Sequence, residues 1–312
     1  MHRLYGGHLI KVYLRSYQAN AVDFALAHLG GQRRAVIQLP TGTGKSLVLL
    51  TIARWAVRQQ KRVYLVAPTV EALTQLHRLS LSVGVRVVFD RATQQAPRLA
   101  PCVLTTYATA WRRFRQRAVD DAVLLLDECH HINYTAPANV ALMQSFPLAI
   151  GASATPWSRG CLPFFDGNRY TYGLTESISA GHSAPYRIGA WQSPVPVDRP
   201  IIYVDNDSDL QQFCRGLRSS DYAIYQRRNA RQIIARYRDE MIKAIVVRRM
   251  LTEGFDYAHC KAVYIGRKTR SRIAVMQMAG RALRPYSGKT ATIFAINEDT
   301  EYLLAQAFQK AG

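Results

Sequence analysis

The stretch Leu39-Pro40-Thr41-Gly42-Thr43-Gly44-Lys45-Ser46 decides how the rest of this chain is interpreted. It follows an apolar strand candidate, residues 35–39, and runs into a helical pattern, residues 47–58. In such a unit, glycines let backbone N–H groups surround an anion, and the positive N-terminal end of the helix adds to the attraction. Lys45 can then reach the outer phosphates, and the hydroxyl of Ser46 can hold Mg²⁺. The general motif begins with glycine where this chain has leucine, so the loop alone also fits an ordinary glycine-rich turn.

Length and composition give the class of protein. The chain has 312 residues, which is long for one ordinary domain and sufficient for two with separate cores. No long apolar stretch stands at the N-terminus, and no window reaches the roughly eighteen apolar residues of a membrane span. We therefore expect a cytoplasmic protein with no membrane contact.

The cysteines carry no metal or disulfide signature. They are scattered, odd in number and form no C-x-x-C pair: Cys102, Cys129, Cys161, Cys214 and Cys260. This spacing argues against a zinc ribbon or an iron–sulfur cluster, and it suits a reducing compartment. We expect all five to be small, buried, apolar residues.

The net charge points to a polyanionic partner. Lys and Arg number 41 against 21 Asp and Glu, a balance of +20. The excess is spread over both halves of the chain, so a basic tail is not its cause. A positive field over the whole body favours nucleic-acid binding that weakens as salt is added.

Strand and helix patterns alternate through the first half. This order predicts a parallel α/β sheet with ligand loops at the carboxyl ends of its strands. The expected strands are residues 35–39, 62–67, 85–89, 102–105, 122–126 and 148–151. Residues 157–190 show no pattern to which chemistry can be assigned.

A second chemical landmark is Asp127-Glu128-Cys129-His130, which follows the apolar strand 122–126. Two carboxylates at the end of a buried parallel strand are unfavourable unless a cation or substrate compensates them. Asp127 can bind the Mg²⁺ that bridges two phosphates, and Glu128 can orient the attacking water. His130 and His131 lack ligand partners at metal-binding spacing, so a coupling or packing role is expected. Two small hydroxyl residues, Ser153 and Thr155, suit a hydrogen-bonding hinge.

Two further segments have a candidate ligand. Leu14-Arg15-Ser16-Tyr17-Gln18 opens an amphipathic helix pattern, and the glutamine amide can pair with an adenine edge. Trp111-Arg112-Arg113-Phe114-Arg115-Gln116-Arg117 interleaves basic and aromatic residues, as single-strand binding surfaces do. A solvated basic face with two core aromatics fits that second segment equally well.

A proline-rich stretch, residues 192–200, predicts a stiff connector. It divides the chain into residues 1–192, a linker at 193–200 and residues 201–312, and the last part repeats the strand–helix alternation. Two stretches stand out there: Leu251-Thr252-Glu253-Gly254-Phe255-Asp256, and Gln277-Met278-Ala279-Gly280-Arg281-Ala282-Leu283-Arg284-Pro285. On one continuous helix, Gln277, Arg281 and Arg284 would share a face.

Taken in order, these motifs resemble those of superfamily 2 helicases of the DEAD/DEAH-box-like group, in particular XPB-like enzymes and the helicase subunits of type III restriction enzymes. The resemblance covers residues 12–297 and includes a DECH form of motif II. Residues 14–18 look like the Q motif and residues 39–46 like motif I, in which leucine is common at the first position. Residues 201–217 match motif IV only loosely. The family implies two tandem RecA-like domains, each with a parallel sheet, that close over ATP and Mg²⁺.

The resemblance also implies a role for individual residues. Catalytic roles fall to Lys45, Glu128, Gln277, Arg281 and Arg284, with the two arginines reaching the γ-phosphate. ATP contacts are implied for Arg15, Gln18, Thr41, Gly42, Thr43, Gly44, Lys45, Ser46, Gly254 and Asp256, and Mg²⁺ contacts for Ser46 and Asp127. Coupling is implied for His130, Ser153 and Thr155, and nucleic-acid contacts for Pro68, Thr69, Thr105, Thr106 and Tyr107.

We therefore expect a nucleic-acid-stimulated ATPase that translocates on DNA and unwinds or remodels it. Three alternatives stay open: an RNA helicase, a binding or annealing protein switched by ATP, and the motor part of a larger replication, repair or restriction assembly. DNA is favoured over RNA because the form Leu-Arg-x-Tyr-Gln is usual in DNA-acting relatives. A monomer is expected.

Overall fold

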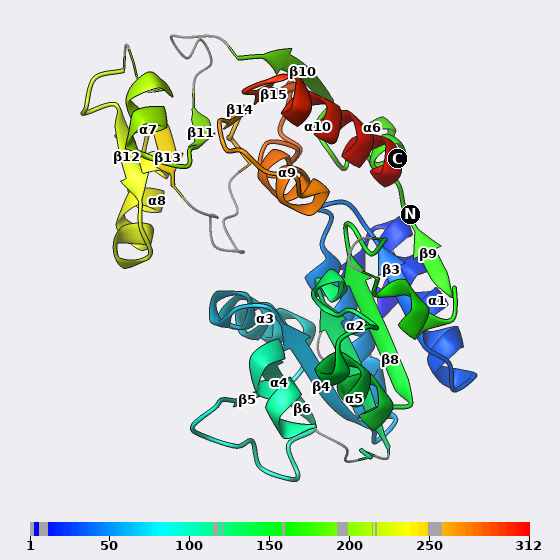
Figure 1. Ribbon diagram of the computed structural model, residues 1–312. Coiled ribbons are helices and arrows are strands. Elements are labelled where there is room, and N and C mark those ends of the chain that lie inside the picture. The colour runs from blue at the N-terminus through cyan, green and yellow to red at the C-terminus, as the bar shows by residue number, and fades with distance from the viewer. Residues whose placement is uncertain are drawn as a thin grey trace. The chain divides into compact units, whose positions relative to one another are not determined.

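The computed structural model describes residues 3–5, 12–114, 118–119, 121–157, 160–191, 199–213, 215, 217–248 and 258–312. The chain forms two compact units (Figure 1). The first comprises Met1–Leu39 and Gly44–Tyr172, and the second comprises Pro40–Thr43 and Gly173–Gly312. Each unit is built around its own sheet.

The first unit has a seven-stranded sheet in the order β5-β6-β4-β7-β8-β3-β9, and every pairing in it is parallel. Its strands are β3 (Ala35–Gln38), β4 (Arg62–Ala67), β5 (Val88–Asp90), β6 (Cys102–Thr106), β7 (Ala122–Asp127), β8 (Leu148–Ser153) and β9 (Arg169–Thr171). The helices between them are α1 (Ser16–Gly30), α2 (Lys45–Arg58), α3 (Val70–Val83), α4 (Tyr107–Arg113) and α5 (Pro137–Ser145), with short 3-10 turns at Cys129–His131 and Leu162–Phe165.

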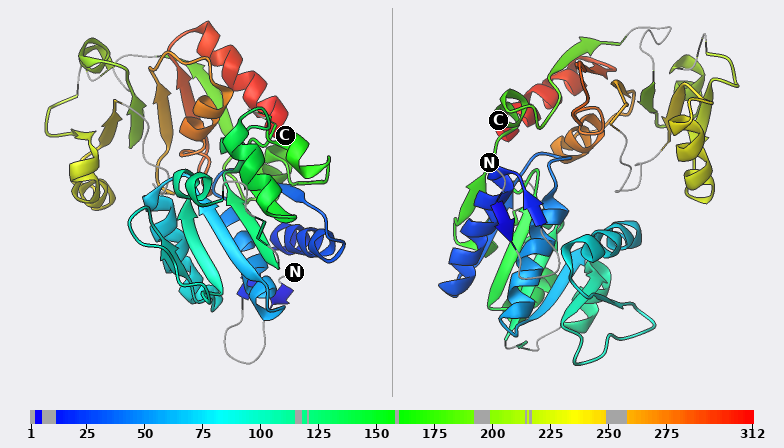
Figure 2. Two further views of the ribbon diagram at one scale, coloured as in Figure 1. Left: turned by 60° about the horizontal axis from the view of Figure 1, so that its bottom comes forward. Right: turned by 180° about the vertical axis from the view of Figure 1, so that it is seen from behind.

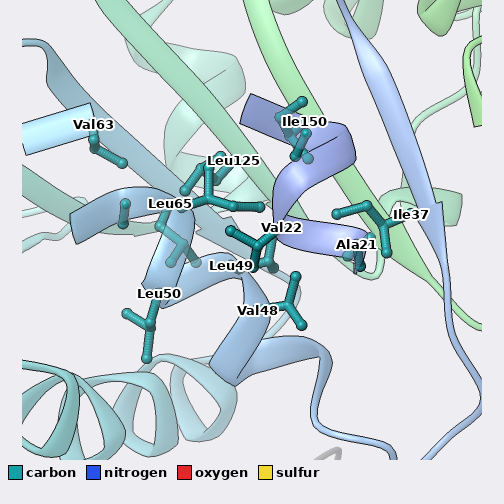
Figure 3. Packing of buried hydrophobic residues seen from close by; sticks show 14 of the residues in the cluster. Ala21, Val22, Ile37, Val48, Leu49, Leu50, Val63, Leu65, Leu125 and Ile150 are labelled. Carbon is teal, nitrogen blue, oxygen red and sulfur yellow. The ribbon is translucent and has the colours of Figure 1, made fainter. Parts of the chain in front are cut away.

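The side chains of these strands lie in two hydrophobic cores, one on each face of the sheet, because successive residues of a strand point to opposite faces. Ile37, Leu65 and Leu125 pack with α1, α2 and α3 on one face, where Figure 3 shows them beside Val22 and Leu49. On the other face, a second core includes side chains of β4 and β7 together with residues of α4 and α5. Figure 2 shows helices on both sides of the strands, the layering expected for a buried parallel sheet.

The second unit has a six-stranded sheet in the order β10-β15-β14-β11-β13-β12, again with parallel pairings throughout. Its strands are β10 (Tyr186–Ala190), β11 (Pro200–Tyr203), β12 (Tyr222–Tyr225), β13 (Ala244–Val247), β14 (Ala262–Ile265) and β15 (Ala291–Ala295). Its helices are α6 (Leu174–Ser179), α7 (Asp207–Phe213), α8 (Ala230–Arg238), α9 (Arg272–Ala279) and α10 (Glu298–Ala311), with a 3-10 turn at Arg227–Asn229.

The predicted α/β class with two parallel sheets is confirmed, but several details differ. A strand pair, β1 (Arg3–Tyr5) with β2 (Val12–Leu14), precedes α1 and was not predicted. Residues 157–190, which were expected to be irregular, contain β9, α6 and β10. These short elements gain their strand or helix character from neighbours far along the chain, and such pairing leaves little local signal.

The division into units also differs from the predicted linker. β10 lies before the proline-rich stretch and β11 after it, yet both strands belong to the second sheet. The contact boundary accordingly falls at Tyr172 and Gly173, ahead of residues 193–200. Residues 192–198 themselves lie outside the described part of the chain.

Two composition-based expectations can be compared with the structure. Cys102, Cys129, Cys161 and Cys260 are free and buried, as expected, while Cys214 lies outside the described residues. Among the described residues, no helix is both long enough and apolar enough to cross a bilayer.

Candidate nucleotide site

The loop after β3 adopts the backbone that its glycines allow. Gly42 and Gly44 both have φ of +87°, in the left-handed region that favours glycine. The hydroxyl of Thr43 donates to the carbonyl of Pro40 at 2.7 Å, which closes a tight turn. α2 then begins at Lys45, directly after Gly44. The chain thus has the strand–turn–helix arrangement that the sequence predicted for a phosphate loop.

Lys45 and Glu128 form an ion pair at the start of α2 and the end of β7. The Lys45 ammonium lies 3.4 Å from Oε1 of Glu128, and the two side chains are 8% and 22% exposed. Glu128 has φ of +49°, a left-handed conformation that costs a non-glycine residue about 1–2 kcal/mol. Burial alone would raise the pKa of Glu128, but the Lys45 ammonium and the hydrogen bond with His130 outweigh it and hold that pKa well below its usual range.

A hydrogen-bonded chain continues from Glu128 into β8. Nδ1 of His130 lies 3.3 Å from Oε2 of Glu128 and 2.8 Å from Oγ of Ser153. The Ser153 hydroxyl donates to Glu128 at 3.4 Å, and the backbone N–H of Thr155 donates to Oγ of Ser153 at 3.0 Å. Four of the residues singled out by their motifs are therefore brought together, and His130 acts as a hydrogen-bonding group.

Asp127 is buried beside this network, at 7% exposure. Its Oδ1 accepts from the backbone N–H of Glu128 at 3.1 Å, and its carbonyl accepts from the hydroxyl of Tyr107 at 2.9 Å. Burial and the nearby acidic groups raise the pKa of Tyr107 well above its ordinary value, so this hydroxyl keeps its proton.

The donor set suits Mg²⁺ held jointly with a phosphate. In the described ranges, no group of three or more His, Cys, Asp or Glu side chains is placed to hold a metal ion, so these residues offer no closed metal cage. Mg²⁺ does not need one, because it commonly binds one or two carboxylates together with phosphates and water. Asp127 and the half-buried Ser46 fit that requirement.

Gln18 lies against the phosphate loop. Its Oε1 accepts from the backbone N–H of Arg15 at 3.0 Å and so closes the first turn of α1. A Cβ at Gly44 would come within 2.5 Å of the Gln18 amide nitrogen, so the end of the Gln18 side chain would have to shift, while the φ of +87° is what favours glycine here.

The aromatic support of this segment was missed by sequence reasoning. The ring of Tyr172 stacks on Tyr17 with 4.2 Å between centroids and 2° between planes. The hydroxyl of Tyr170 donates to the carbonyl of Tyr17 at 3.1 Å. The cluster of tyrosines at 170–172 was the available signal, but nothing local linked it to a helix at the other end of the unit.

The candidate nucleic-acid residues follow β4 and β6, and the structure separates them into two groups. Thr69 and Thr106 act as N-caps, because their hydroxyls accept from Ala72 and Thr109 at 3.1 and 3.3 Å. Pro68 precedes the first cap and is half-buried. Thr105 and Tyr107 are 0% and 3% exposed, so their side chains offer no surface to a nucleic acid in this structure.

Only the first part of the basic and aromatic segment 111–117 is described. α4 ends at Arg113, whose guanidinium is paired with Asp90 at 3.3 Å. Arg115, Gln116 and Arg117 lie outside the described residues.

In the second unit, the expectation of one helical face for Gln277, Arg281 and Arg284 was wrong. α9 ends at Ala279, and tight turns follow, in which the N–H of Arg281 donates to Met278 and that of Ala282 to Ala279. The reason is that Gly280 and the later Pro285 give the helix no continuation. Gln277 stays on α9, whereas both arginines lie beyond it.

Both arginines are held in the second unit by their surroundings. Arg281 is 8% exposed and lies beside Tyr203, whose pKa is raised by burial against the opposing effect of the guanidinium. Burial lowers the pKa of Arg284 to about 10. Lys289 donates to the carbonyls of Arg284 and Ala258 at 2.9 and 2.8 Å. Gly254 and Asp256, the other expected site residues of this unit, lie outside the described residues.

Comparison with known proteins finds similarity in the first half of the chain. A family model for the type III restriction enzyme res subunit matches residues 11–158. A DNA 3'-5' translocase, XPB2 of Sulfurisphaera tokodaii, is 29% identical over 148 residues, which make up 47% of this chain and 31% of the translocase. The segment matched by the family model, residues 11–158, holds the phosphate loop and the Asp127–Thr155 network.

Solved structures share the fold at low identity. The ATP-dependent Type ISP restriction-modification enzyme LlaBIII, bound to DNA, gives a TM-score of 0.71 at 15% identity, over 96% of this chain and 30% of that one. A fragment of a putative HsdR subunit of a type I restriction enzyme from Vibrio vulnificus gives 0.70 at 19%, over 95% and 65%. S. cerevisiae Dbp5, bound to RNA and ADP BeF3, gives 0.64 at 12%, over 96% and 88%. In its motif order, its phosphate-loop backbone and its two parallel sheets, the chain resembles superfamily 2 helicases, and its fold is that of tandem RecA-like domains.

Proposed function

We propose that this protein is a nucleic-acid-stimulated ATPase that moves along single-stranded DNA and unwinds or remodels duplex DNA. The observation that carries the proposal is the hydrogen-bonded chain Lys45–Glu128–His130–Ser153, which joins the phosphate loop to the ends of β7 and β8. The net charge of +20 supports a polyanionic partner. The match of residues 11–158 to a restriction-enzyme family and the likeness of the chain to a DNA translocase favour DNA as that partner.

The residues of the first unit divide the chemistry between them. Backbone N–H groups around Gly42 and Gly44 and the N-terminus of α2 would hold the phosphates of ATP, and Lys45 would neutralise their charge. Ser46 and Asp127 would hold Mg²⁺, which would neutralise negative charge on the phosphates when bound. Gln18 and Arg15 would line the adenine side.

Glu128 would orient the attacking water. Its ion pair with Lys45 would keep the carboxylate occupied until a phosphate binds. A phosphate that reaches Lys45 competes with Glu128 for the same ammonium. When Lys45 turns away, His130 and Ser153 still hold hydrogen bonds to the Glu128 carboxylate, so it stays placed to accept a hydrogen bond from water.

Gln277, Arg281 and Arg284 are proposed to complete the site from the second unit. An arginine that meets the developing charge on a transferred phosphoryl group lowers the barrier, and it does so only when the domains have closed. Closing and reopening would move the strand over Thr69, Thr106 and the basic surface. Gly254 and Asp256 are proposed to contribute to nucleotide binding.

The test is an ATPase assay with single-stranded DNA, duplex DNA, forked DNA and RNA, using the wild type and Lys45→Ala. We expect stimulation by DNA and loss of turnover in the variant. Equal turnover in the two proteins would refute the assignment of the phosphate loop. Stronger stimulation by RNA would replace DNA with RNA as the substrate, and binding without turnover would favour an annealing protein switched by ATP.

A further inference from the structure

A second cavity in the first unit lies apart from the nucleotide site. It measures about 340 Å³ and is lined by residues that include Arg62, Tyr64, Asp90, Arg98, Arg113 and Phe114. Tyr64 and Phe114 belong to the core on the α4 face of the sheet. Arg62 is the first residue of β4 and Asp90 belongs to the edge strand β5, whereas the phosphate loop, Asp127 and Ser153 follow or end β3, β7 and β8. The cavity therefore opens at a different part of the sheet from the proposed ATPase machinery.

The charge of the cavity is strongly one-sided. Arg62, Arg98 and Arg113 face a single carboxylate, Asp90, which is already paired with Arg113 at 3.3 Å and accepts from the N–H of Ala96 at 3.2 Å. Asp90 is 4% exposed, so it is fixed in this role. Two guanidinium charges remain without a carboxylate among the described lining residues.

Two of these arginines are already held in position. Arg62 donates to the carbonyl of Pro97 at 2.9 Å, and its guanidinium lies 4.8 Å from the centre of the Tyr64 ring. Arg113 donates to the carbonyl of Arg91 at 3.1 Å as well as to Asp90. A ligand that bound here would meet donors whose side-chain entropy is already lost, which favours binding.

Both fixed guanidiniums keep a buried donor in reserve. The Nε atoms of Arg62 and Arg113 are buried and have no hydrogen-bond acceptor within the described part of the chain. A buried donor without an acceptor is unfavourable, so an acceptor that reached either Nε atom would be favoured there. Arg98 is exposed at the rim, where it also lines an adjoining cavity of about 250 Å³.

We propose that this cavity, defined by Arg62, Arg98 and Arg113, is a binding site for a phosphate monoester group. Guanidinium forks match the geometry of phosphate, and the doubly charged monoester balances the two uncompensated arginines. The volume admits a phosphate with an attached sugar or short chain, and Tyr64 and Phe114 supply an apolar wall. A free mononucleotide and the 5′-phosphate end of a nucleic-acid strand present the same group.

The experiment measures binding of inorganic phosphate by calorimetry at constant ionic strength, in the full chain carrying Lys45→Ala to suppress binding at the phosphate loop. In that background, Arg98→Glu is expected to weaken phosphate binding about tenfold or more, the worth of one charge-assisted hydrogen bond. Arg33→Glu is the matched control, because Arg33 is also exposed in the first unit but does not line the cavity. Its affinity should stay close to that of the background protein.

A second variant separates the effect of the guanidinium's paired N–H donors from the effect of its positive charge. Arg62→Lys keeps the positive charge and loses the paired donors, so phosphate binding should weaken in it too, while sensitivity to salt is retained. Melting curves show whether each variant is folded, and Arg98→Gln replaces Arg98→Glu if the charge reversal unfolds the chain. Phosphate affinity that is unchanged in the folded Arg98 and Arg62 variants, or undetectable in the background protein, would overturn the proposal.

The source of the phosphate is decided by two further ligands in the same assay. A nucleoside 5′-monophosphate tests the free ligand, and matched oligonucleotides with a 5′-phosphate or a 5′-hydroxyl test the strand end. An advantage for either phosphorylated ligand that disappears in Arg98→Glu supports the site and identifies its source. The absence of any such advantage contradicts a monoester site.

Discussion

The two units hold their candidate site residues in different ways. In the first unit, Lys45, Glu128, His130 and Ser153 bond to one another through their side chains. In the second unit, Arg284 is held through its backbone, because Lys289 donates to its carbonyl at 2.9 Å. The side-chain network of the first unit holds its groups against one another, whereas the hydrogen bond from Lys289, a backbone clamp, holds the turn that carries Arg284. The guanidinium of Arg284 is itself largely buried.

The largest expected effect tests whether Arg284 of the second unit takes part in ATP hydrolysis. Arg284→Ala should lower ATP turnover about a thousandfold, the range known for arginine fingers, while nucleotide affinity changes far less. Steady-state kinetics and nucleotide binding measured on the same protein separate the two effects. Arg272→Ala, at the start of α9 and outside the motif, is the control. Equal turnover in the two variants would leave the second unit without a catalytic role.

The next effect tests the side-chain network of the first unit. Glu128→Gln keeps the size of the side chain but removes the charge that Lys45 and His130 stabilise. Turnover should fall about a hundredfold or more, the contribution of a positioned general base, while ATP still binds. Single-turnover measurements isolate the chemical step. A variant that hydrolyses ATP as fast as the wild type would show that another group orients the water.

A third prediction concerns stability, and a matched pair of glycines tests it. Gly44→Ala should lower the free energy of unfolding by about 2 kcal/mol, because φ is +87° and the new Cβ would lie 2.5 Å from the Gln18 amide. Gly30→Ala, at the end of α1 with nothing within 4 Å, should be neutral or slightly stabilising. Urea unfolding followed in the three proteins measures both values. Similar losses in the two variants would mean that the loop geometry is not the cause.

The smallest effect tests the backbone clamp. Burial lowers the pKa of Lys289 to about 8, below the ordinary lysine value near 10.5. Between these values the unfolded chain binds more protons than the folded one, so stability rises with pH. We expect wild type to gain on the order of 1 kcal/mol relative to Lys289→Met between pH 7 and 9. Urea unfolding of both proteins at the two pH values measures this gain. If the wild type instead loses stability relative to Lys289→Met as pH rises, burial is not the cause of the lowered pKa.

The contrast between the units also explains where sequence reasoning succeeded. The phosphate loop and the Asp127–His130 segment each combine a strand, a turn and a helix within a few residues, so their backbone is set by local chemistry. The arginine segment was misjudged because one glycine and one proline ended α9 at Ala279, and a face shared by Gln277 and Arg284 needs an unbroken helix. The domain boundary was misjudged because prolines mark a stiff connection without showing which sheet the flanking strands join.

By itself, the sequence determined the class of fold, the order of the motifs and the residues of the phosphate loop, because each depends on periodicity or on residues close in the chain. The tertiary structure decided which of these residues touch. It joined Lys45 to Glu128, stacked Tyr172 on Tyr17 and gathered Arg62, Arg98 and Arg113 around one cavity. Such contacts join residues that are far apart in the chain. They form only when strands pair and helices pack, so no local sequence pattern predicts them.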